Sequence, residues 1–585
     1  MKTVVATLNA KYIHTSLALR CLKAYSEPEF MMEIAEYTIK DPTINIVTDL
    51  YSKQPDVIGF SCYIWNIEET IKVIEMLKKI RPELTIVLGG PEVSYDVTYW
   101  LDRVTDADYI VVNEGEETFK HLLETIRDGT PLKKVAGLAW RKEGKAVINP
   151  PREKLDLKNV SSPFRFEEDL SELSKRVTYF ETSRGCPYSC AFCLSSIEVG
   201  VRYFDVTQVK EDLLFLMDNG AKTIKFVDRT FNIRRDYALD MFSFLIQNAR
   251  PGVVFQFEIT ADIMRPEVIE YINEHAPKGL FRFEIGVQST NDAVNLLVQR
   301  RQNFEKLTRT VTMVRDGGKI AQHLDLIAGL PEEDYSSFRK TFNDVFAFGV
   351  EEVQLGFLKM LRGTGLRLTA EQHDYVYMDH SPYEILGNNV LSFQDIIRIK
   401  QVEDVLEKYW NSHRMDHTVK YLIASAYSGS AFDFFQQFGA YWEEKGWSRI
   451  GHQLEDLFTR LYSFLSEHHL EHLQTAEALM KYDYLLHQKY KPRKAWWPAA
   501  LSKEETGRIF RYVTEQPDSG LTEKDLYKHG FLSEIQLDIE LLTKHDTLSN
   551  TPHYLFAFYN PKTREPEITF IPRDAVTVNS VQPKN

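Results

Sequence analysis

Three cysteines lie close together in the sequence, Cys186, Cys190 and Cys193, with the spacing CxxxCxxC. A loop with this spacing can supply three thiolates to a [4Fe-4S] cluster and leave the fourth iron without a protein ligand. That iron is then open to a small molecule. The spacing therefore predicts an iron–sulfur site that does chemistry.

Zinc and disulfides are the competing interpretations of these cysteines. Structural zinc takes four Cys or His ligands, usually in pairs, and no second CxxC or HxxxH lies nearby to complete the set. Disulfides are disfavoured because the chain has five cysteines in 585 residues, three of them close together, which suits a reducing compartment. We therefore favour a cluster.

The run from Arg184 to Cys193 resembles the cluster loop of the radical S-adenosylmethionine (SAM) superfamily. The resemblance implies that SAM chelates the open iron through its amino and carboxylate groups. It also implies that an electron, from a donor such as flavodoxin or ferredoxin, cleaves SAM to a 5'-deoxyadenosyl radical that abstracts hydrogen from unactivated carbon. The cofactors would carry this reaction, and the protein would position them and exclude water.

Length and composition limit the remaining possibilities. A chain of 585 residues is too long for one hydrophobic core, so we expect two to four domains. The net charge of -14 argues against a general nucleic-acid or anionic-membrane surface. No apolar run is long enough for a membrane span, and the first residues lead into a short strand instead of a signal peptide. We expect a cytoplasmic protein that binds neither nucleic acid nor membrane.

The first part of the chain alternates strand and helix patterns. Short apolar runs at 2–8, 33–38, 57–63, 85–90 and 109–113 predict strands, and helical periodicity at 16–25, 67–80 and 116–126 predicts helices between them. Such alternation predicts a parallel sheet with helices on both faces and ligands beyond the carboxyl ends of the strands.

The loops after these predicted strands carry the candidate ligand-binding residues of this part, which are Asn9, Tyr12, His14, Tyr63, Trp65, Gly89, Gly90, Glu114 and Gly115. Paired glycines permit close backbone approach to a ligand. A Gly-Gly-Pro turn is more often simple strand-to-helix geometry, so these turns alone do not establish a ligand site.

Together these loops resemble the cobalamin-binding domain of B12-dependent radical SAM proteins, over roughly residues 1–140. The Asp-x-His-x-x-Gly motif, which supplies a lower axial histidine in methionine-synthase-like domains, is absent. The resemblance then implies cobalamin bound without a histidine ligand, and we expect Trp65 or Tyr63 to shield the lower face of the corrin. Trp65 could instead be a core aromatic at the start of a helix.

A proline-containing stretch at 150–176 reads as a linker, and a second alternating series follows it. Strands are predicted at 177–182, 223–227, 254–260, 281–287, 322–328 and 352–358, and helices at 206–219, 235–248, 266–274, 292–298, 304–316 and 335–349. Periodicity does not separate an open sheet from a partial barrel. The resemblance favours a partial (β/α)6 barrel.

The strand ends of this second series carry a second set of cofactor-binding candidates, which are Asp228, Arg229, Glu258, Glu284, Gln288, Ser289, Ile327 and Gly329. By the resemblance, Asp228 and Arg229 lie near the methionyl end of SAM, Gln288 and Ser289 near its ribose or carboxylate, and Ile327 and Gly329 against adenine. Each polar residue could instead cap a helix or be a satisfied strand-end group.

Beyond residue 365 the pattern changes to helices rich in aromatic residues. Histidines at 468, 469 and 472 could bind metal, but a solvated helix face is favoured. Residues 521–525 predict a capped helix, and a DNA-reading helix-turn-helix there is disfavoured by the acidic charge.

We expect an α/β protein with a Rossmann-like cobalamin-binding domain (1–149), a linker (150–176), a radical SAM core (177–365) and a mainly helical C-terminal domain (366–585). No cysteine follows Cys193, so a second cluster is not expected. The resemblance implies methylation of an unactivated carbon of a small-molecule or peptide substrate. Two alternatives stay open: a rearrangement or redox reaction that uses cobalamin without methyl transfer, and a cobalamin- or cluster-binding regulator.

Overall fold

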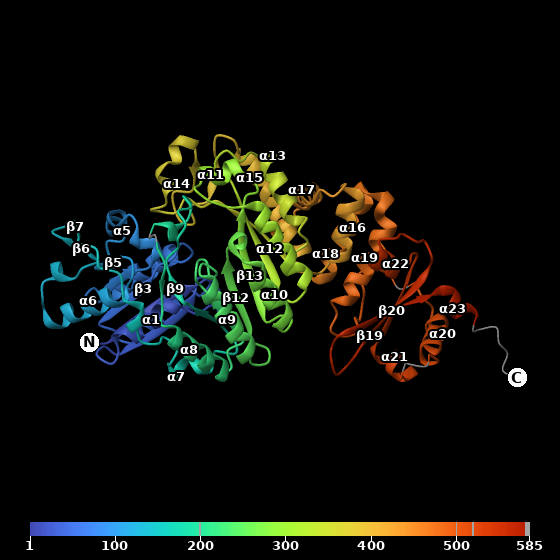
Figure 1. Ribbon diagram of the computed structural model, residues 1–585, viewed down its shortest axis with the longest axis horizontal. Helices are drawn as coiled ribbons and strands as arrows, with labels where there is room; N and C mark the ends of the chain where they lie inside the picture. The colour runs from blue at the N-terminus through green and yellow to red at the C-terminus, as the bar shows by residue number, and fades with distance from the viewer. Residues whose placement is uncertain (198–199, 499, 517–519, 579–585) are drawn as a thin grey trace. The chain divides into compact units, whose positions relative to one another are not determined.

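The computed structural model describes residues 1–197, 200–498, 500–516 and 520–578. The chain forms two compact units, Met1–Ile396 and Ile397–Asn585. The first unit contains both series of alternating strands and helices, coloured blue to yellow in Figure 1.

The N-terminal part of the first unit is a seven-stranded sheet in the order β2-β1-β3-β4-β5-β6-β7. Its first five strands are parallel, and β6 and β7 add an antiparallel hairpin. The strands are β1 (Thr3–Asn9), β2 (Met32–Thr38), β3 (Val57–Ser61), β4 (Thr85–Gly89), β5 (Tyr109–Val111), β6 (Leu138–Lys142) and β7 (Lys145–Ile148). The predicted parallel sheet is confirmed, and the hairpin was missed because Lys142–Lys145 carries mostly polar residues around a tight turn.

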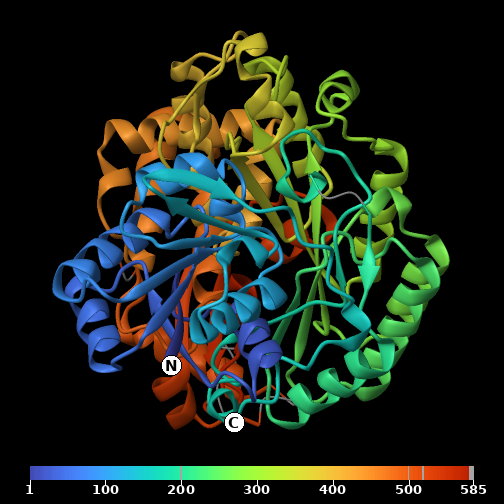
Figure 2. The ribbon, with the colours of Figure 1, turned by 90° about the vertical axis from the view of Figure 1, so that its left-hand side faces the viewer.

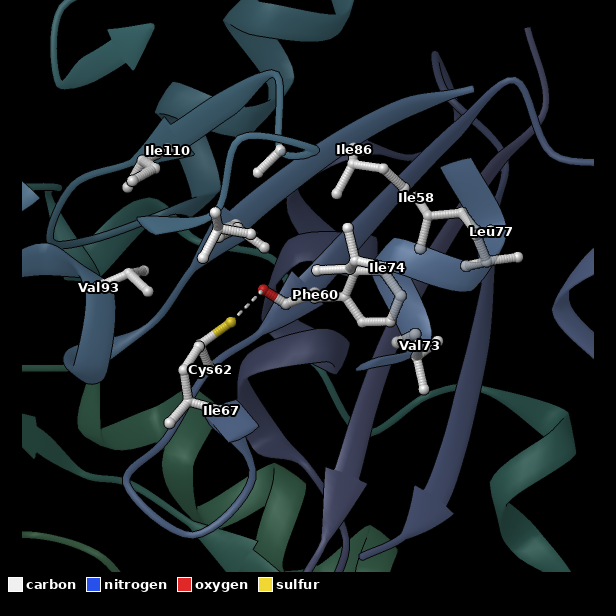
Figure 3. Close-up of a cluster of buried hydrophobic side chains, with 14 of the residues drawn as sticks. Ile58, Phe60, Cys62, Ile67, Val73, Ile74, Leu77, Ile86, Val93 and Ile110 are labelled. Carbon is white, nitrogen blue, oxygen red and sulfur yellow. Dashed lines mark hydrogen bonds between the residues drawn. The ribbon is translucent and has the colours of Figure 1, made fainter. Parts of the chain in front are cut away.

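Helices cover both faces of this sheet, as the alternation predicts. One buried cluster joins the sheet to α1 (Leu17–Ser26) and α6 (Glu116–Asp128). The other joins it to α2 (Thr43–Ser52), α3 (Ile67–Ile80) and α5 (Val97–Arg103). Figure 3 shows the second cluster, where Phe60 of β3 packs with Ile74 and Leu77 of α3. Helix α3 has the bounds that its periodicity predicts, whereas α2, α4 (Pro91–Ser94) and α5 were not predicted.

The second series forms a six-stranded parallel sheet in the order β15-β14-β13-β12-β11-β8. Its order is open, with β8 and β15 at the edges, as in a partial (β/α)6 barrel. The strands are β8 (Val177–Phe180), β11 (Thr223–Phe226), β12 (Val254–Ile259), β13 (Phe281–Gln288), β14 (Ala321–Ala328) and β15 (Glu352–Phe357). All six predicted strands of this series are confirmed.

The helices of the second series lie between these strands in sequence, and Figure 1 shows α9, α10 and α12 beside β12 and β13. They are α8 (Val206–Asp218), α9 (Arg235–Asn248), α10 (Pro266–His275), α11 (Asp292–Leu297), α12 (Phe304–Gly317) and α13 (Tyr335–Phe346). Strands β13 and β14 alternate between fully buried and half-buried residues. Such alternation means that apolar side chains face the helices while polar side chains face the inside of the curved sheet.

The segment between the two sheets is more ordered than a flexible linker. It contains a short 3-10 helix, η2 (Leu157–Asn159), and α7 (Glu167–Leu170). Arg20 of α1 forms an ion pair with Asp169 at 2.6 Å, and the Phe164 ring stacks on Phe180 of β8 at 4.8 Å. The two sheets therefore belong to one packed unit, which Figure 2 shows from the side of the N-terminal strands.

After β15 the chain runs through α14 (Gly365–Leu368), η5 (Ala370–His373) and a small hairpin of β16 (Val376–Tyr377) and β17 (Ile385–Gly387) before α15 (Phe393–Leu406). No helix in the described parts of the chain is long and apolar enough to cross a membrane.

The second unit is mainly helical, as predicted. It contains a π-helical turn at Glu407–Asn411, then α16 (Asp416–Ala426), α17 (Ala431–Glu444), α18 (Leu454–His468), α19 (Leu473–Leu486), α20 (Lys503–Thr514), α21 (Glu523–His529), α22 (Ile539–His545) and α23 (Arg573–Val578). Thr522 and Asp525 form the capping box that residues 521–525 predict. An antiparallel sheet of β18 (Gly530–Ile535), β19 (His553–Tyr559) and β20 (Pro566–Pro572) was not predicted.

Candidate cofactor site

A cavity of about 740 Å³ lies within the first unit, between the carboxyl ends of the N-terminal strands and the start of the second sheet. Its volume is in the range of small-molecule and cofactor sites. Ligands of parallel α/β sheets bind beyond the carboxyl ends of the strands. The predicted residues on its wall are Asn9, His14, Tyr63, Trp65, Gly89, Gly90, Glu114, Gly115 and Arg229.

Tyr63 and Trp65 form a stacked pair on the cavity wall, with ring centroids 4.3 Å apart and an angle of 8° between the rings. Trp65 is 47% exposed and α3 begins at Ile67, so Trp65 is not a core residue. The pair presents a flat aromatic surface to the cavity. Its contact with a corrin stays a prediction.

The Gly89-Gly90 turn packs directly against the loop after β3. The Cys62 N–H donates to the Gly89 carbonyl at 2.7 Å, and a Cβ on Gly90 would lie 2.6 Å from the Cys62 carbonyl oxygen. Gly90 also has a positive φ of 102°, which residues with a side chain rarely adopt. Glycine is therefore required at this position by the contact between two loops of the cavity.

His14 lies on the cavity wall and Nδ1 of its ring pairs with the Tyr179 hydroxyl at 2.8 Å. Burial lowers the pKa of His14, and the charge of Lys11 lowers it further, so the ring is neutral near pH 7. Its loop also pairs with the edge of the second sheet, because the Val177 N–H donates to the Ile13 carbonyl at 2.8 Å.

Tyr12 is the candidate of this set that lies outside the cavity lining. Its ring is 61% exposed, and its hydroxyl donates to Glu172 at 2.5 Å. The positively charged Arg176 side chain lies over the ring at 5.1 Å. Tyr12 therefore contacts the segment before β8 and does not line the cavity.

The predicted cluster loop lies at the edge of this cavity, whose wall includes Gly185. Cys186 and Cys190 are buried and Cys193 is half-buried. Gly185 has a φ of 98°, and a Cβ there would lie 2.0 Å from the Gly200 carbonyl oxygen. The loop closes tightly around the thiols because glycine permits this approach.

The three thiols lie close enough to influence one another. Burial raises the pKa of Cys190, Arg300 lowers it, and the neighbouring thiolates raise it again. Burial is also the largest cause of the raised pKa of Cys186, to which Cys193 adds. The described residues contain no group of three or more His, Cys, Asp or Glu arranged around a single metal ion. A cluster makes a different demand, because each thiolate binds a different iron.

Ion pairs connect the two sheets at this edge, and Glu114 is the one residue among them that the sequence predicted as a ligand-binding candidate. Arg184 pairs with Glu116 at 2.6 Å and with Glu181 at 2.7 Å, and Arg202 pairs with Glu114. Burial raises the pKa of Glu114, but hydrogen bonds from Arg202 and the Leu155 N–H lower it further than burial raises it. The pKa of Glu114 therefore lies below its usual value. The contacts of Arg184 with Glu116 and of Arg202 with Glu114 could not be predicted from the sequence. Their partners lie far apart in the chain and meet only when the two sheets pack together.

The second set of candidates lies on the strand ends of the six-stranded sheet. Asp228 is 1% exposed and accepts hydrogen bonds from the Thr182 N–H and hydroxyl and from the Ser183 hydroxyl. Burial raises its pKa to about 6 despite these donors. This is a satisfied strand-end carboxylate, the alternative that the sequence left open, and a contact of Asp228 with SAM stays a prediction.

Glu258 and Glu284 face the inside of the sheet beside basic residues. Glu284 accepts two hydrogen bonds from Lys225, each at 2.8 Å, and Arg229 lies 4.0 Å from Glu258. Burial raises the pKa of Glu258, while Arg229 and Lys225 lower it. Lys225 was not selected from the sequence because a lysine within a strand gives no signal of its own.

Gln288, Ser289, Ile327 and Gly329 lie at the ends of β13 and β14. Gln288 has a φ of 68°, and Ser289 is fully buried, where it donates to Glu333 at 2.6 Å. Ile327 is half-buried and pairs with Gly356 of β15, and Gly329 has a φ of 95°. None of these four lines the 740 Å³ cavity, and Arg229 is the member of the second candidate set that does.

Models of known protein families match both parts of the chain that form this cavity. The model of the B12 binding domain matches residues 3–123, and the model of the Radical SAM superfamily matches residues 180–345. The chain therefore contains a B12 binding domain and a radical SAM domain. A third model, described as "Protein of unknown function (DUF4080)", matches residues 371–556 of this radical SAM protein.

Curated relatives of the radical SAM protein are similar over part of its length. "Uncharacterized methyltransferase PH0819" of Pyrococcus horikoshii is 30% identical over 38% of this chain and 51% of the relative. "2-(S-pantetheinyl)-carbapenam-3-carboxylate methyltransferase" of Streptantibioticus cattleyicolor is 28% identical over 51% and 46%. "Cobalamin-dependent radical SAM methyltransferase TokK" of Streptomyces tokunonensis is 25% identical over 58% and 53%. The chain thus spans about half the length of the curated relatives it matches.

Solved structures share the fold at lower identity. The methyltransferase TsrM of Kitasatospora setae, with tryptophan and a SAM analogue bound, has a TM-score of 0.56 at 16% identity, covering 67% of this chain and 80% of TsrM. The radical enzyme OxsB, with aqua-cobalamin and SAM bound, has a TM-score of 0.57 at 17% identity, covering 83% and 79%. Both likenesses concern the fold.

The two domains imply cobalamin, a [4Fe-4S] cluster and SAM, and the donors present fit the first two groups. The cavity offers glycine turns and a stacked aromatic pair at the strand ends of the B12 binding domain. The cysteine loop offers three neighbouring thiols, all of them free, with no other described cysteine close in sequence. SAM would bind beside that loop, where the strand ends of the second sheet carry polar groups.

Proposed function

We propose that this protein is a cobalamin-dependent radical SAM enzyme that methylates an unactivated carbon atom. One observation carries the proposal. Gly89 and Gly90 of the B12 binding domain line the same cavity as Gly185 and Arg229 of the radical SAM domain. A cobalt-bound methyl group and a radical generated at the cluster would therefore act in one shared space.

The residues of the chain bind, orient and shield in this proposal. The cluster and SAM supply a carbon-centred radical when bound, and cobalamin supplies the methyl group. Cys186, Cys190 and Cys193 hold the cluster. Asn9, His14, Glu114 and Gly115 line the cavity with the glycine turn and would surround the corrin, and Tyr63 or Trp65 would shield one of its faces. The candidates from Asp228 to Gly329 position SAM.

A polar substrate fits the inner face of the second sheet. Lys225 with Glu284 and Arg229 with Glu258 form two ion pairs there, and Arg229 and Glu258 keep 55% and 32% of their side-chain surface exposed. Charged side chains are rarely retained on an inner face without a polar partner or ligand. We propose a small molecule or a peptide, with flavodoxin or ferredoxin as electron donor.

The free thiols also support the cytoplasm as the compartment, since all five cysteines are unpaired. We further propose the division into a cobalamin-binding domain (1–149), a linker (150–176), a radical SAM core (177–365) and a C-terminal domain (366–585). The boundary between compact units, after Ile396, shows that the start of the last region packs with the first unit.

Anaerobic reconstitution with iron, sulfide, hydroxocobalamin, SAM and a reductant tests the function. We expect both 5'-deoxyadenosine and S-adenosylhomocysteine, because one SAM is cleaved and another donates its methyl group. Formation of 5'-deoxyadenosine alone would favour a rearrangement or redox reaction. Absence of both products in a chain that binds both cofactors would favour a regulator.

A further inference from the structure

The segment of residues 358–387, here called the strap, contacts loops of both candidate cofactor regions. It leaves the second sheet after β15, and its two ends meet, because the Ile385 N–H donates to the Leu358 carbonyl at 3.1 Å. The whole strap belongs to the first compact unit. Its contacts indicate which loops it holds in place.

One end of the strap contacts the cavity loops of the B12 binding domain. The Tyr383 hydroxyl donates to Glu92 at 2.5 Å, and Glu92 directly follows the Gly89-Gly90-Pro91 turn. The Ser381 hydroxyl donates to the Ile64 carbonyl, and Ile64 lies between the stacked rings of Tyr63 and Trp65 in sequence. Two separate loops of the cavity are thus bonded to neighbouring residues of the strap.

Tyr383 is held in place from several sides. It is fully buried and has a φ of 56°, a costly conformation for a residue with a large side chain. Arg362 donates to the Tyr383 hydroxyl at 3.3 Å, pairs with Asp96 at 2.6 Å and lies 3.6 Å over the Tyr99 ring. A buried hydroxyl with two polar partners is a rigid anchor.

The other contact of the strap lies at the end of β14. The Tyr375 hydroxyl donates to the Gly329 carbonyl at 2.8 Å, and Tyr375 is 8% exposed. The Ile385 side chain fills the space in which a Cβ of Gly329 would lie, 1.9 Å from its Cδ1 atom. Gly329 is the residue proposed to face adenine.

We propose that the strap is a shared positioning element, in which Tyr383 and Ser381 fix the cobalamin loops and Tyr375 fixes the SAM loop. This inference rests on the proposed cofactors but concerns residues that touch neither of them. Loss of one buried hydrogen bond is expected to change an affinity by about tenfold, and the bond from Tyr383 to the Glu92 carboxylate is the stronger of the two.

Three tyrosine-to-phenylalanine variants separate the two contacts from general stability. Tyr383→Phe is expected to weaken hydroxocobalamin binding by about tenfold and to change the electron paramagnetic resonance spectrum of bound cob(II)alamin, with SAM affinity within twofold of wild type. Tyr375→Phe is expected to weaken SAM binding and leave the cobalamin spectrum unchanged. Tyr559→Phe is the matched control, because it removes a buried hydroxyl that donates to the Leu485 carbonyl in the second unit.

Hydrogen exchange of the cofactor-free chain gives a readout that does not depend on the proposed function. Tyr383→Phe is expected to speed exchange in residues 61–66 and 89–92, and Tyr559→Phe is not. If Tyr383→Phe does not fold, Ser381→Ala replaces it in both measurements. Wild-type affinity, spectrum and exchange in Tyr383→Phe would overturn the inference. A wild-type chain that binds no hydroxocobalamin contradicts the proposed function, while exchange still tests the strap.

Discussion

The spacing of three cysteines predicts more about this chain than any other residues do. The three cysteines lie within one short loop, so the type and number of protein ligands for a cluster can be predicted without knowing the fold. The contacts of the residues proposed to position SAM cannot be predicted in the same way. Ser289 is directed by Glu333, which lies 44 residues away and gives no sequence signal except a Leu-Pro-Glu-Glu turn.

Replacement of Cys190 tests the cluster at the residue scale. Cys190→Ala removes one of three thiolates, and we expect the iron and sulfide content of anaerobically reconstituted protein to fall by most of its wild-type value. Cys62→Ala is the control, because Cys62 is a buried core residue whose thiol faces the Phe60 carbonyl. Equal iron content in Cys190→Ala and wild type would remove the cluster assignment.

Glu333 predicts a pH dependence of stability. Its side chain is fully buried and accepts from Ser289 and Thr341, and burial raises its pKa to about 7 from 4.5, although these hydrogen bonds lower it. The folded state therefore binds the proton more tightly than the unfolded state. The stabilisation is complete below pH 4.5 and is lost as pH rises through 7, by about 3 kcal/mol at most.

Glu333→Gln keeps the acceptor and cannot ionise. We expect its thermal midpoint to fall less than that of wild type between pH 4.5 and 7.5, and to exceed wild type at pH 7.5. Calorimetry over this range makes the measurement. Glu332→Gln is the neighbouring control, because Glu332 is exposed and its pKa is lowered by Asn389. A wild-type pH profile in Glu333→Gln would show that the buried carboxyl does not titrate here.

At the scale of elements, periodicity predicts the parallel strands and most helices. Helices α3 and α9 have the predicted bounds, since both show one apolar face over fourteen residues. The short helices α4 and α5 were missed because four and seven residues are too few to show a clear helical periodicity. The antiparallel hairpin of β6 and β7 was missed because local patterns do not specify pairing partners.

The predicted linker was the element most changed by tertiary contacts. Glu36 of β2 accepts from Arg20 of α1 at 3.3 Å and from Arg176, just before β8, at 2.7 Å. The Ser16 N–H, at the end of the cavity loop after β1, also donates to Glu36 at 2.5 Å. The Glu36 carboxylate thus holds three parts of the unit together: the cavity loop after β1, helix α1 beside the first sheet, and the segment before the second sheet.

Glu36→Ala is expected to destabilise the first unit by about 3 kcal/mol, because it leaves two buried arginines without a shared carboxylate. Limited proteolysis should then cut residues 10–16 faster than in wild type. Glu33→Ala is the control on the same strand, since the Glu33 side chain is 40% exposed and pairs with the half-buried Lys53. Equal stability of the two variants would show that the buried network adds nothing.

At the scale of the molecule, domain organisation was only partly readable. Long helices begin at α15 and not directly after residue 365, because the strap between them forms short helical turns and a hairpin and hydrogen-bonds to Gly329 and Glu92 of the first unit. Composition reports the type of secondary structure and not its packing partner. The sheet β18-β19-β20 was not predicted either, although its central strand is a mostly apolar run that is buried on both faces.

The second unit is expected to fold alone. It has its own aromatic core around Tyr409, Phe438 and Trp442, and a further buried cluster beneath its antiparallel sheet. A fragment of residues 393–585, which begins with α15 at its N-terminal turn, should unfold cooperatively in calorimetry and resist protease. A fragment of residues 430–585 is the control, because it lacks α15 and α16 and exposes the residues that pack on them. If the longer fragment shows no cooperative transition, the second compact unit depends on the first for its stability, and the division after Ile396 does not mark an independent domain.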